Sequence, residues 1–537
     1  MKRFLLTIAL VLLCGVTMAQ TVVTTINTDH VYTLKCKATD HSGFIGVTDN
    51  GEINGRSASS TYIRFEVADG VDNGYYIKVA GKYLNANGNT ITPSETKSTV
   101  WILGVPTHTT NVVTFQCKGT HNYLNNNYTT GTPYLKANTH NGGPGSTNAC
   151  SLWEMRVYTA DAWKNEELKY LGYVGGYASE LKDEIEAITT FDEATAFEAS
   201  HERLAVNTND YYRIVAVAPK AANGNRDYKT LAFNGEGNLV TTPSSASNIN
   251  QIFKFENAGD GTFYLKNLNA DGYLNKILAG TYRSGIVAKE NACKLDLTHY
   301  GSAQWKLHNS ESNDSKHCLF AENHAGETIA YACSGWENGA NSASAWYIIP
   351  ATEVEITVNE YASVYLPFAV NVKGATAYAV TETSETSATL TEMVDIAANE
   401  GAILAGKGNA TLNIINEATT DWGTNKLEGT TYNKMIEGEA YVLGNVDGVG
   451  LYKALMTDGK WKNNANKAYL PASALPAAAQ GAANFSFRFE GEGTTGVEEV
   501  KTENGNVKTI YDLTGRRVEA ITAPGIYIVN GKKVLVK

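Results

Sequence analysis

The chain has 537 residues, 18% of them charged, and a formal net charge of −11. At about 100–200 residues per domain, this length predicts three to five domains. The acidic balance argues against a nucleic-acid partner, because a phosphate backbone requires a basic surface. The 49 Gly and 30 Tyr, together with the low charge, are typical of an exported β-protein.

The first nineteen residues have the pattern of a secretory signal peptide. Lys2 and Arg3 precede an apolar run over 4–13, and Ala19 supplies a small residue at the end. The apolar run is too short to span a bilayer easily, and no other long apolar run follows. We therefore expect residues 1–19 to be a signal peptide and the mature protein to have no stable transmembrane segment.

A short phrase recurs in the next part of the chain. Gly-Lys-Tyr-Leu-Asn at 81–85 returns in related form at 121–125 and 271–275. Each copy is followed by a predicted strand with an aromatic residue at its centre, and these residues are Trp101, Trp153 and Trp305. With three less regular units, this pattern defines six units at about 31–68, 74–106, 112–158, 210–257, 262–309 and 316–350.

The six units fall into two groups of three, and three such units can close around a pseudo-threefold axis. The Tyr-Leu-Asn phrase and the aromatic closing strand resemble the β-trefoil of the ricin-B-type lectins and the fascin-like family. The resemblance implies two lectin-like β-trefoils, assigned to 20–158 and 206–350. The Gln-x-Trp motif that closes each lectin unit is missing here, so we expect the closing tryptophans to be core residues.

The segment 159–205 differs in character and predicts short helices. Leu181, Ile185 and Ile188 lie on one helix face, and Thr190 with Glu193 fits a capping box for a further helix. Glycines interrupt the pattern between them. We expect a helical spacer between the trefoils, with its charged helices forming a solvated linker.

Residues 351–495 return to alternating strands without a threefold repeat, which predicts an antiparallel β-sandwich. The predicted fold class is therefore mostly β: two β-trefoils joined by a short helical spacer, then a β-sandwich and a small C-terminal β module at 496–537. Within that module, Asn530-Gly531 between two β-runs predicts a hairpin.

The C-terminal module closely resembles the C-terminal sorting domain of the type IX (Por) secretion system. Three blocks carry the resemblance in order: Tyr-Asp-Leu-Thr-Gly-Arg-Arg-Val, Pro-Gly-Ile-Tyr-Ile-Val and Lys-Lys-Val-Leu-Val-Lys. The resemblance implies export by the type IX machinery, and a secreted or outer-membrane cell-surface location. The motif residues are Tyr511, Asp512, Gly515, Arg516, Gly525 and Tyr527.

Six cysteines remain after the leader, three in each trefoil region. Cys318 and Cys333 fall in one unit on segments that can form adjacent strands, so they are the first disulfide candidate. Export permits such a bond, while burial as small side chains is an equal alternative.

Sugar sites combine an aromatic face with an acid or amide that takes two hydroxyls. The sixth unit offers Trp336 in a Gly/Asn-rich turn, with amides and an acid nearby, and the third unit offers two tyrosines and an amide. The candidate carbohydrate-binding residues are Trp336, Asn338, Asn341, Glu322, Asn148, Tyr128 and Tyr134.

No catalytic motif, metal-ligand spacing or cofactor fingerprint is found, so we predict no enzyme, no metal and no cofactor. The predicted function is non-catalytic binding of a glycan or glycoprotein at the cell surface. Two alternatives stay open: a structural or adhesive protein whose trefoil loops bind another protein, and a trefoil-type protease inhibitor.

Overall fold

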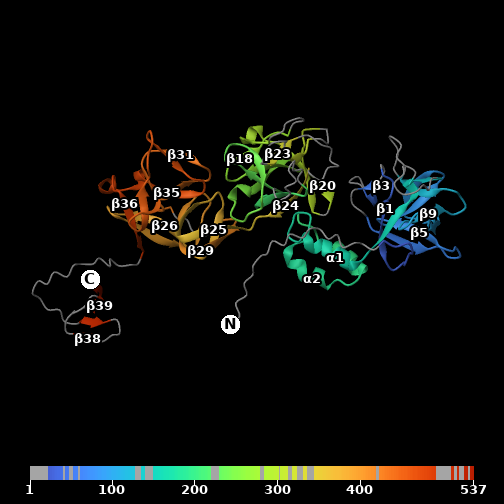
Figure 1. Cartoon of the computed structure of the whole chain (residues 1–537), viewed down its shortest axis with the longest axis horizontal. Helices are drawn as coiled ribbons and strands as arrows, with labels where there is room; N and C mark the ends of the chain where they lie inside the picture. Colours follow the sequence, from blue (N-terminus) through green and yellow to red (C-terminus); the bar gives the residue numbers. More distant parts are fainter. Residues whose placement is uncertain are drawn as a thin grey trace, which may run out of the picture. The chain divides into compact units, whose positions relative to one another are not determined.

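The computed structural model divides into two compact units, one formed by Met1–Ser245 with Asn250–Ala351 and the other by Ala246–Ile249 with Thr352–Lys537. Figure 1 follows the chain by colour. The structure describes residues 22–39, 43–47, 52–57, 61–126, 135–139, 149–218, 229–277, 284–301, 303–312, 317–322, 330–334, 344–418, 423–490, 510–512, 517–518, 525–529 and 532–536.

Twelve strands form the first β-trefoil of the first unit. Six of them pair in a closed antiparallel ring (β12, β1, β4, β5, β8, β9), which the Val113–Trp153 bridge completes. The other six form three hairpins, one per repeat. The strands are β1 Val31–Cys36, β2 Phe44–Val47, β3 Ile53–Ser57, β4 Ile63–Val67, β5 Gly74–Val79, β6 Lys82–Asn87, β7 Thr90–Ser94, β8 Trp101–Gly104, β9 Thr114–Cys117, β10 Tyr123–Asn126, β11 Leu135–Asn138 and β12 Trp153–Tyr158.

A second set of twelve strands repeats this arrangement. The ring runs β24, β13, β16, β17, β20 and β21, and the hairpins are β14–β15, β18–β19 and β22–β23. The strands are β13 Tyr212–Ala216, β14 Thr230–Phe233, β15 Leu239–Thr242, β16 Phe253–Gly259, β17 Thr262–Asn267, β18 Gly272–Leu274, β19 Ile286–Val287, β20 Leu295–Gly301, β21 Gln304–Asn309, β22 Leu319–Glu322, β23 Ala330–Ser334 and β24 Ala345–Pro350.

One hydrogen bond explains why the Tyr-Leu phrase and the closing tryptophan occur together. Trp101 Nε1 donates to Leu84 O at 2.8 Å, and Trp153 Nε1 donates to Leu124 O at 2.9 Å. Both leucines and both indoles are buried in the trefoil core. In the last repeat, Trp346 Nε1 donates to Leu319 O at 2.9 Å. The prediction that these closing tryptophans are core residues is confirmed.

The fifth repeat departs from the expected pattern. Its closing position, the first residue of β20, is the buried Leu295, and Trp305 lies on the next strand, β21. The prediction that Trp305 closes the fifth repeat is therefore wrong. Its indole Nε1 instead donates to Val174 O at 2.9 Å, in the segment between the trefoils.

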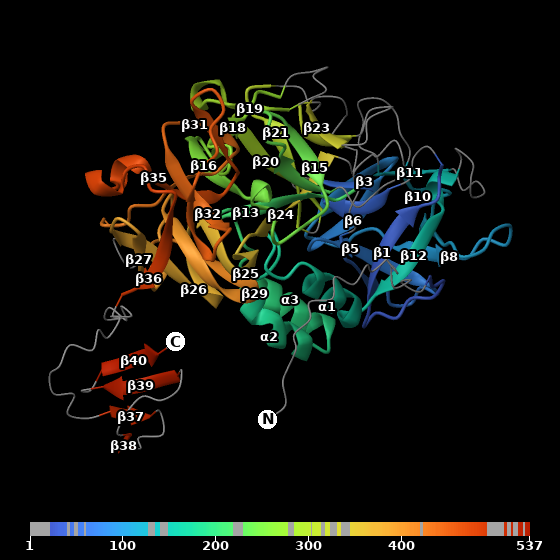
Figure 2. The ribbon, with the colours of Figure 1, turned by 60° about the vertical axis from the view of Figure 1, so that its left-hand side comes forward.

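Three short helices follow the first trefoil: α1 Ala160–Lys169, α2 Lys182–Ala187 and α3 Phe191–Ser200 (Figure 2). The predicted capping box is present, since Thr190 Oγ1 accepts from Glu193 N and Glu193 Oε2 accepts from Thr190 N. The helices are not a solvated linker. Their buried side chains, which include Trp163, Ile185 and Phe197, pack in one core with two trefoil residues, Val31 and Tyr158.

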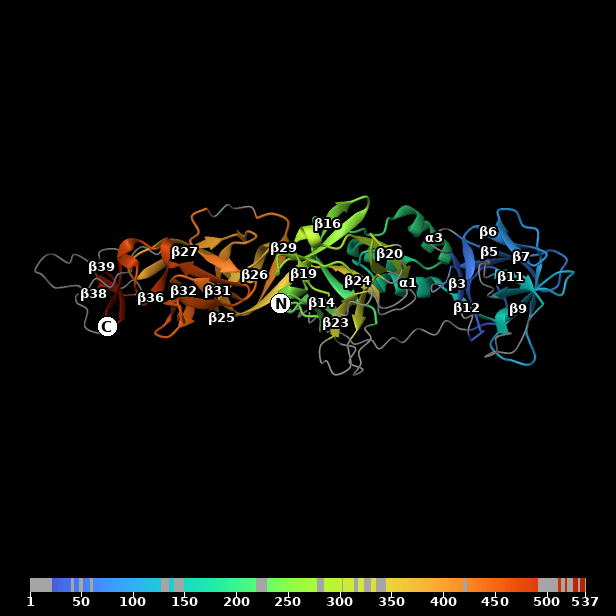
Figure 3. The ribbon, with the colours of Figure 1, turned by 90° about the horizontal axis from the view of Figure 1, so that it is seen from above.

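The second unit contains a ten-stranded sheet in the order β25-β29-β26-β27-β36-β33-β32-β35-β30, with β28 paired to β26 (Figure 3). Both halves of the sheet contribute to one core, including Ile403, Tyr441 and Phe485, so the sheet folds over as a β-sandwich. The strands are β25 Glu353–Tyr365, β26 Ala369–Thr383, β27 Ser387–Met393, β28 Asp395–Ile396, β29 Gly401–Ile415, β30 Glu428–Thr430, β32 Ala440–Asn445, β33 Val449–Lys453, β35 Lys467–Pro471 and β36 Asn484–Phe489, with a separate ribbon of β31 Lys434–Glu437 and β34 Lys460–Asn463.

The last four strands form a small sheet in the order β38-β37-β39-β40. Their bounds are β37 Ile510–Asp512, β38 Arg517–Val518, β39 Gly525–Val529 and β40 Lys532–Val536. Val529 pairs with Lys532 across β39 and β40, which confirms the predicted hairpin. None of the helices in the described ranges has the length and apolar composition needed to cross a membrane.

Candidate functional site

Most of the predicted sugar-binding residues lie outside the described residues. These are Trp336, Asn338, Asn341, Asn148, Tyr128 and Tyr134. Glu322 is the last residue of β22. The grouping of these seven residues into sugar sites therefore stays a prediction.

The predicted cysteine pair lies on neighbouring chain segments. Cys318 directly precedes β22, and Cys333 on β23 pairs in register with Phe320. The disulfide itself stays a prediction.

The predicted sorting motif is partly described. Tyr511 and Asp512 lie on β37, and Asp512 pairs in register with Tyr527 on β39, the strand that Gly525 begins. Gly515 and Arg516 lie outside the described residues. The sorting role of these residues stays a prediction.

A polar cluster that the sequence pattern did not predict lies on the first trefoil. The Tyr83 hydroxyl donates to Glu66 Oε1 at 2.6 Å, and Lys97 Nζ lies 3.2 Å from Glu66 Oε2. Lys78 Nζ is 3.9 Å from the same carboxylate. The Tyr76 ring packs edge-on against Tyr83, and Lys97 lies over the Tyr76 ring. We call these five residues the first tyrosine–glutamate cluster.

The second trefoil carries the same cluster. The Tyr273 hydroxyl donates to Glu256 at 3.0 Å, and Lys289 Nζ lies 2.5 Å from Glu256 Oε2. Tyr264 packs edge-on against Tyr273, and Lys289 lies over the Tyr264 ring. Lys266, over the Tyr273 ring, takes the place of Lys78. Together they form the second tyrosine–glutamate cluster.

The two clusters occupy corresponding positions. In the first, Glu66 ends its repeat on β4 and Tyr83 lies on β6; in the second, Glu256 lies on β16 and Tyr273 on β18. Each glutamate precedes its tyrosine by 17 residues. That shared spacing before the Tyr-Leu pair is the sequence signal that could have revealed the clusters. The matching positions at the ends of the other closing strands hold no acid: Gly104, Arg156, Thr298 and Ile349.

Both glutamates are held ionised. The hydrogen bond from Tyr83 and the neighbouring lysines lower the pKa of Glu66. Partial burial opposes ionisation of Glu256, but the hydrogen bonds from Lys289 and Tyr273 outweigh it and lower its pKa. Burial and the bond to Glu256 raise the pKa of Tyr273 to about 12. At neutral pH each cluster thus presents a carboxylate, an ammonium group and a tyrosine ring on the trefoil surface.

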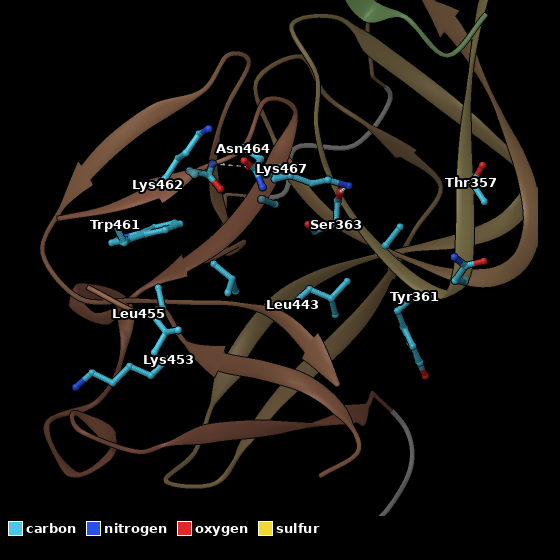
Figure 4. Close-up of a pocket in the computed structure, with 16 residues that line it drawn as sticks. Thr357, Tyr361, Ser363, Leu443, Lys453, Leu455, Trp461, Lys462, Asn464 and Lys467 are labelled. Carbon is cyan, nitrogen blue, oxygen red and sulfur yellow. Dashed lines mark hydrogen bonds between the residues drawn. The ribbon is translucent and has the colours of Figure 1, made fainter. Parts of the chain in front are cut away.

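The described part of the second unit contains a cavity of about 650 Å³ between its strands (Figure 4). Its wall includes Trp461, Lys462 and Asn463 of β34, Lys467 of β35 and Ser363 of β25. We call it the β34 cavity. Its lining residues are spread over about a hundred positions of the sequence, so no local motif predicts the cavity.

No protein-family model matches the chain, and no curated protein matches it. Among solved structures, it is similar to the designed threefold symmetric protein ThreeFoil, with 20% identity, a TM-score of 0.21, and coverage of 26% of this chain and 97% of that one. It is also similar to SeviL bound to asialo-GM1 saccharide, with 18% identity, a TM-score of 0.20, and coverage of 24% and 97%. A third is the hemolytic lectin CEL-III, with 12% identity, a TM-score of 0.21, and coverage of 68% and 74%. At these identities and TM-scores, the similarities assign no function to the chain.

Proposed function

We propose that the protein is a non-catalytic carbohydrate-binding protein that is exported to the cell surface or beyond. The observation that carries this proposal is the duplicated tyrosine–glutamate cluster. The trefoil does not need this cluster in every repeat, because the matching positions on the other closing strands hold no acid. The cluster spans the boundary between the first and second repeats of each trefoil, the same place in both.

The chemistry of the cluster suits a sugar. An ionised carboxylate accepts hydrogen bonds from two neighbouring hydroxyls, and a lysine ammonium donates to a third oxygen. Tyr76 and Tyr264 are half-buried, so each ring retains an accessible part beside its carboxylate. The Glu66 and Lys97 side chains are 36% and 49% exposed, which leaves them within reach of a ligand.

The test is binding of the full chain to a panel of immobilised glycans, alongside the variant Glu66→Gln/Glu256→Gln. Glutamine keeps the shape of each side chain and removes the charge. We expect the variant to bind the recognised glycan at least about tenfold more weakly, because two charge-assisted hydrogen bonds are lost. The matched control is Glu311→Gln, which breaks an exposed ion pair with Lys276 on the second trefoil outside the cluster.

Two results would overturn the proposal. One is that no glycan of the panel retains the chain. The other is that the double variant binds the recognised glycan as tightly as the Glu311→Gln control does.

A second candidate function, binding of another protein, is favoured by the burial of the closing tryptophans. Trp101, Trp153 and Trp346 are fully buried, so their rings cannot stack on a ligand. The two functions separate in one experiment with a captured glycoprotein partner. Binding that survives enzymatic removal of its glycans supports protein recognition, and binding that disappears supports the carbohydrate proposal.

The route of export is part of the proposal and rests on the two ends of the chain. The signal-peptide pattern of 1–19 and the sorting-domain resemblance of 496–537 support passage through the type IX secretion machinery. In a bacterium that has this machinery, deletion of 496–537 is expected to retain the protein inside the outer membrane. Secretion of the truncated chain at the normal level would contradict this route.

A further inference from the structure

The β34 cavity differs in charge from the rest of the chain. Three lysines, Lys453, Lys462 and Lys467, are among its 16 lining residues, and none of those described residues is Asp or Glu. Lys453 is paired with Glu439, outside the lining, at 2.6 Å, so the positive charge offered to a ligand comes from Lys462 and Lys467. The whole chain has a formal net charge of −11. A cavity whose wall carries lysines and no acid is suited to an anionic ligand, since the lysines supply positive charge where that ligand binds.

Lys467 is held in place within the cavity. Its Nζ donates to the main-chain carbonyl of Ser363 at 3.3 Å, and Figure 4 shows its side chain extending toward Ser363. The turn that carries it is fixed by the buried Asn463, whose Nδ2 donates to Lys467 O and to Thr430 Oγ1, both at 2.9 Å. An ammonium group fixed in this way is a positioned charge rather than a mobile surface lysine.

Trp461 adds an unused donor. The side chain is only 4% exposed, and its indole Nε1 has no hydrogen-bond partner in the part of the chain that the structure describes. A buried N–H without a partner costs about 1–3 kcal/mol, which an oxygen acceptor on a ligand would recover. The indole ring meanwhile packs edge-on against Tyr469, so its orientation is fixed.

The remaining wall combines neutral polar groups with apolar ones. Thr357, Asn359 and Asn464 supply hydroxyl and amide groups, while Leu443 and Leu455 supply apolar surface. This mixture matches a pyranose ring, which has polar edges and apolar faces. A volume of about 650 Å³ lies within the range of small-ligand sites, roughly 300–1,000 Å³.

We propose that the β34 cavity binds an acidic sugar unit, a pyranose that carries a carboxylate or a sulfate. The anionic group lies beside Lys467 and Lys462, and a sugar oxygen accepts from Trp461 Nε1. A neutral sugar is disfavoured, because its hydroxyls accept weaker hydrogen bonds from the lysine ammonium groups than an anionic oxygen does. This site is separate from the tyrosine–glutamate clusters, so the proposal for the cavity does not depend on the function proposed for the clusters.

The test measures binding of glucuronic acid, glucose 6-sulfate and glucose to the full chain by isothermal titration calorimetry. We expect one or both acidic sugars to bind and glucose to bind at least about tenfold more weakly, because a charge-assisted hydrogen bond is absent. The two acidic probes distinguish a carboxylate ligand from a sulfate ligand. Equal binding of glucose, or no binding of either acidic sugar, would overturn the proposal.

Three variants locate the site. Lys467→Gln and Trp461→Phe are each expected to weaken binding of the acidic sugar, the first by about tenfold or more and the second by several-fold. Trp461→Phe keeps a packed aromatic ring, so it remains informative if Lys467→Gln does not fold. Lys460→Gln is the matched control. Lys460 lies on β34 next to Trp461, pairs with Glu437 at 2.7 Å and does not line the cavity.

Two further measurements test whether the acidic sugar binds in the β34 cavity and whether the cavity selects a sugar. The Glu66→Gln/Glu256→Gln variant should retain full binding of the acidic sugar, and a loss there would assign the binding to the trefoils and overturn the proposal. A hexaglutamate peptide should bind more weakly than the acidic sugar. Tighter binding of the peptide that is lost in Lys467→Gln would identify the cavity as a site for acidic polypeptides instead.

Discussion

Arg203 holds Glu167 through two parallel hydrogen bonds. Its Nη1 donates to Glu167 Oε2 at 2.9 Å, and its Nη2 donates to Glu167 Oε1 at 2.8 Å. Glu167 is buried on α1, and burial raises its pKa while Arg203 opposes that rise. The guanidinium also lies over the Tyr177 ring. A single side chain beyond the end of α3 therefore compensates a buried carboxylate on α1 and joins the two helices.

Replacing Arg203 with Met should destabilise the helical spacer. The variant keeps much of the apolar stem but leaves Glu167 buried without its cation, a change that costs about 3 kcal/mol in buried ion pairs. Differential scanning calorimetry measures the effect, since each cooperative part of a multidomain chain gives its own transition. We expect the transition of the first unit to move to lower temperature and that of the second unit to stay in place.

The double variant Arg203→Met/Glu167→Leu is the control for that experiment. It removes the unpaired carboxylate as well, so it should recover most of the lost stability. An equal loss in the single and the double variants would mean that packing rather than charge compensation holds the spacer.

Trp153→Phe should weaken the first trefoil. The substitution removes the hydrogen bond to Leu124 O, leaves that buried carbonyl with one partner fewer and opens a small cavity, together about 2 kcal/mol. Trp305→Phe is the informative comparison, because this partly exposed indole bonds to Val174 of the spacer rather than to its own hairpin. Urea unfolding monitored by intrinsic fluorescence should show the larger loss for Trp153→Phe, and the reverse order would contradict the assigned roles.

The repeat architecture could be predicted because its signals are local. Leu84 and Leu124 of two Tyr-Leu phrases enter the core, and their carbonyls accept from the closing tryptophan of the same repeat, so the two residue types occur together. In the fifth repeat the buried Leu295 occupies the closing position, and the pattern wrongly assigns that position to the nearby Trp305. The capping box of α3 was equally predictable, since all of its atoms lie within four residues.

The sites could not be predicted for the opposite reason. The Glu66–Tyr83 contact joins two strands, and its spacing gains meaning only when the second trefoil shows it again. The β34 cavity collects side chains from β25 to β35, and no periodic pattern connects Ser363 with Lys467. The spacer does not form the predicted solvated linker, and no pattern within 159–205 shows this, because two residues that complete its core, Val31 and Tyr158, belong to the trefoil.

Thr190→Ala should loosen the start of α3 without unfolding the unit. The Thr190 hydroxyl accepts from Glu193 N at 3.2 Å, and loss of such a cap costs about 1 kcal/mol, or roughly a fivefold change in local opening. Hydrogen exchange of the first-turn amides measures this local opening.

Glu193 adds a pH dependence to the same cap. The backbone N–H groups of Thr189 and Thr190 lower the pKa of Glu193 to about 2, below its ordinary 4.5. The protection from Glu193 should therefore be complete above pH 4.5 and disappear as the pH falls toward 2.

Lys306 makes the stability of the second trefoil depend on alkaline pH. The side chain is 4% exposed on β21, and its Nζ donates to Ser344 Oγ at 2.6 Å and lies over the Tyr300 ring. Burial lowers the pKa of Lys306 to about 8, from 10.5 for an ordinary lysine. Between these two values the unfolded chain binds more protons than the folded chain, so the free energy of unfolding rises with pH.

Lys306→Met isolates this effect. Methionine removes the charge and keeps a side chain of similar length, so at neutral pH the variant should be more stable by on the order of 2 kcal/mol, less what Ser344 loses as a partner. The gain should shrink as the pH rises from 8 toward 10.5, because the wild-type amine becomes neutral over that range. Calorimetric scans of both proteins from pH 6 to 10.5 measure the difference, which also subtracts the titration of other groups such as Tyr300. A stability difference that does not change with pH would show that Lys306 remains charged in the folded trefoil and that its burial is compensated locally.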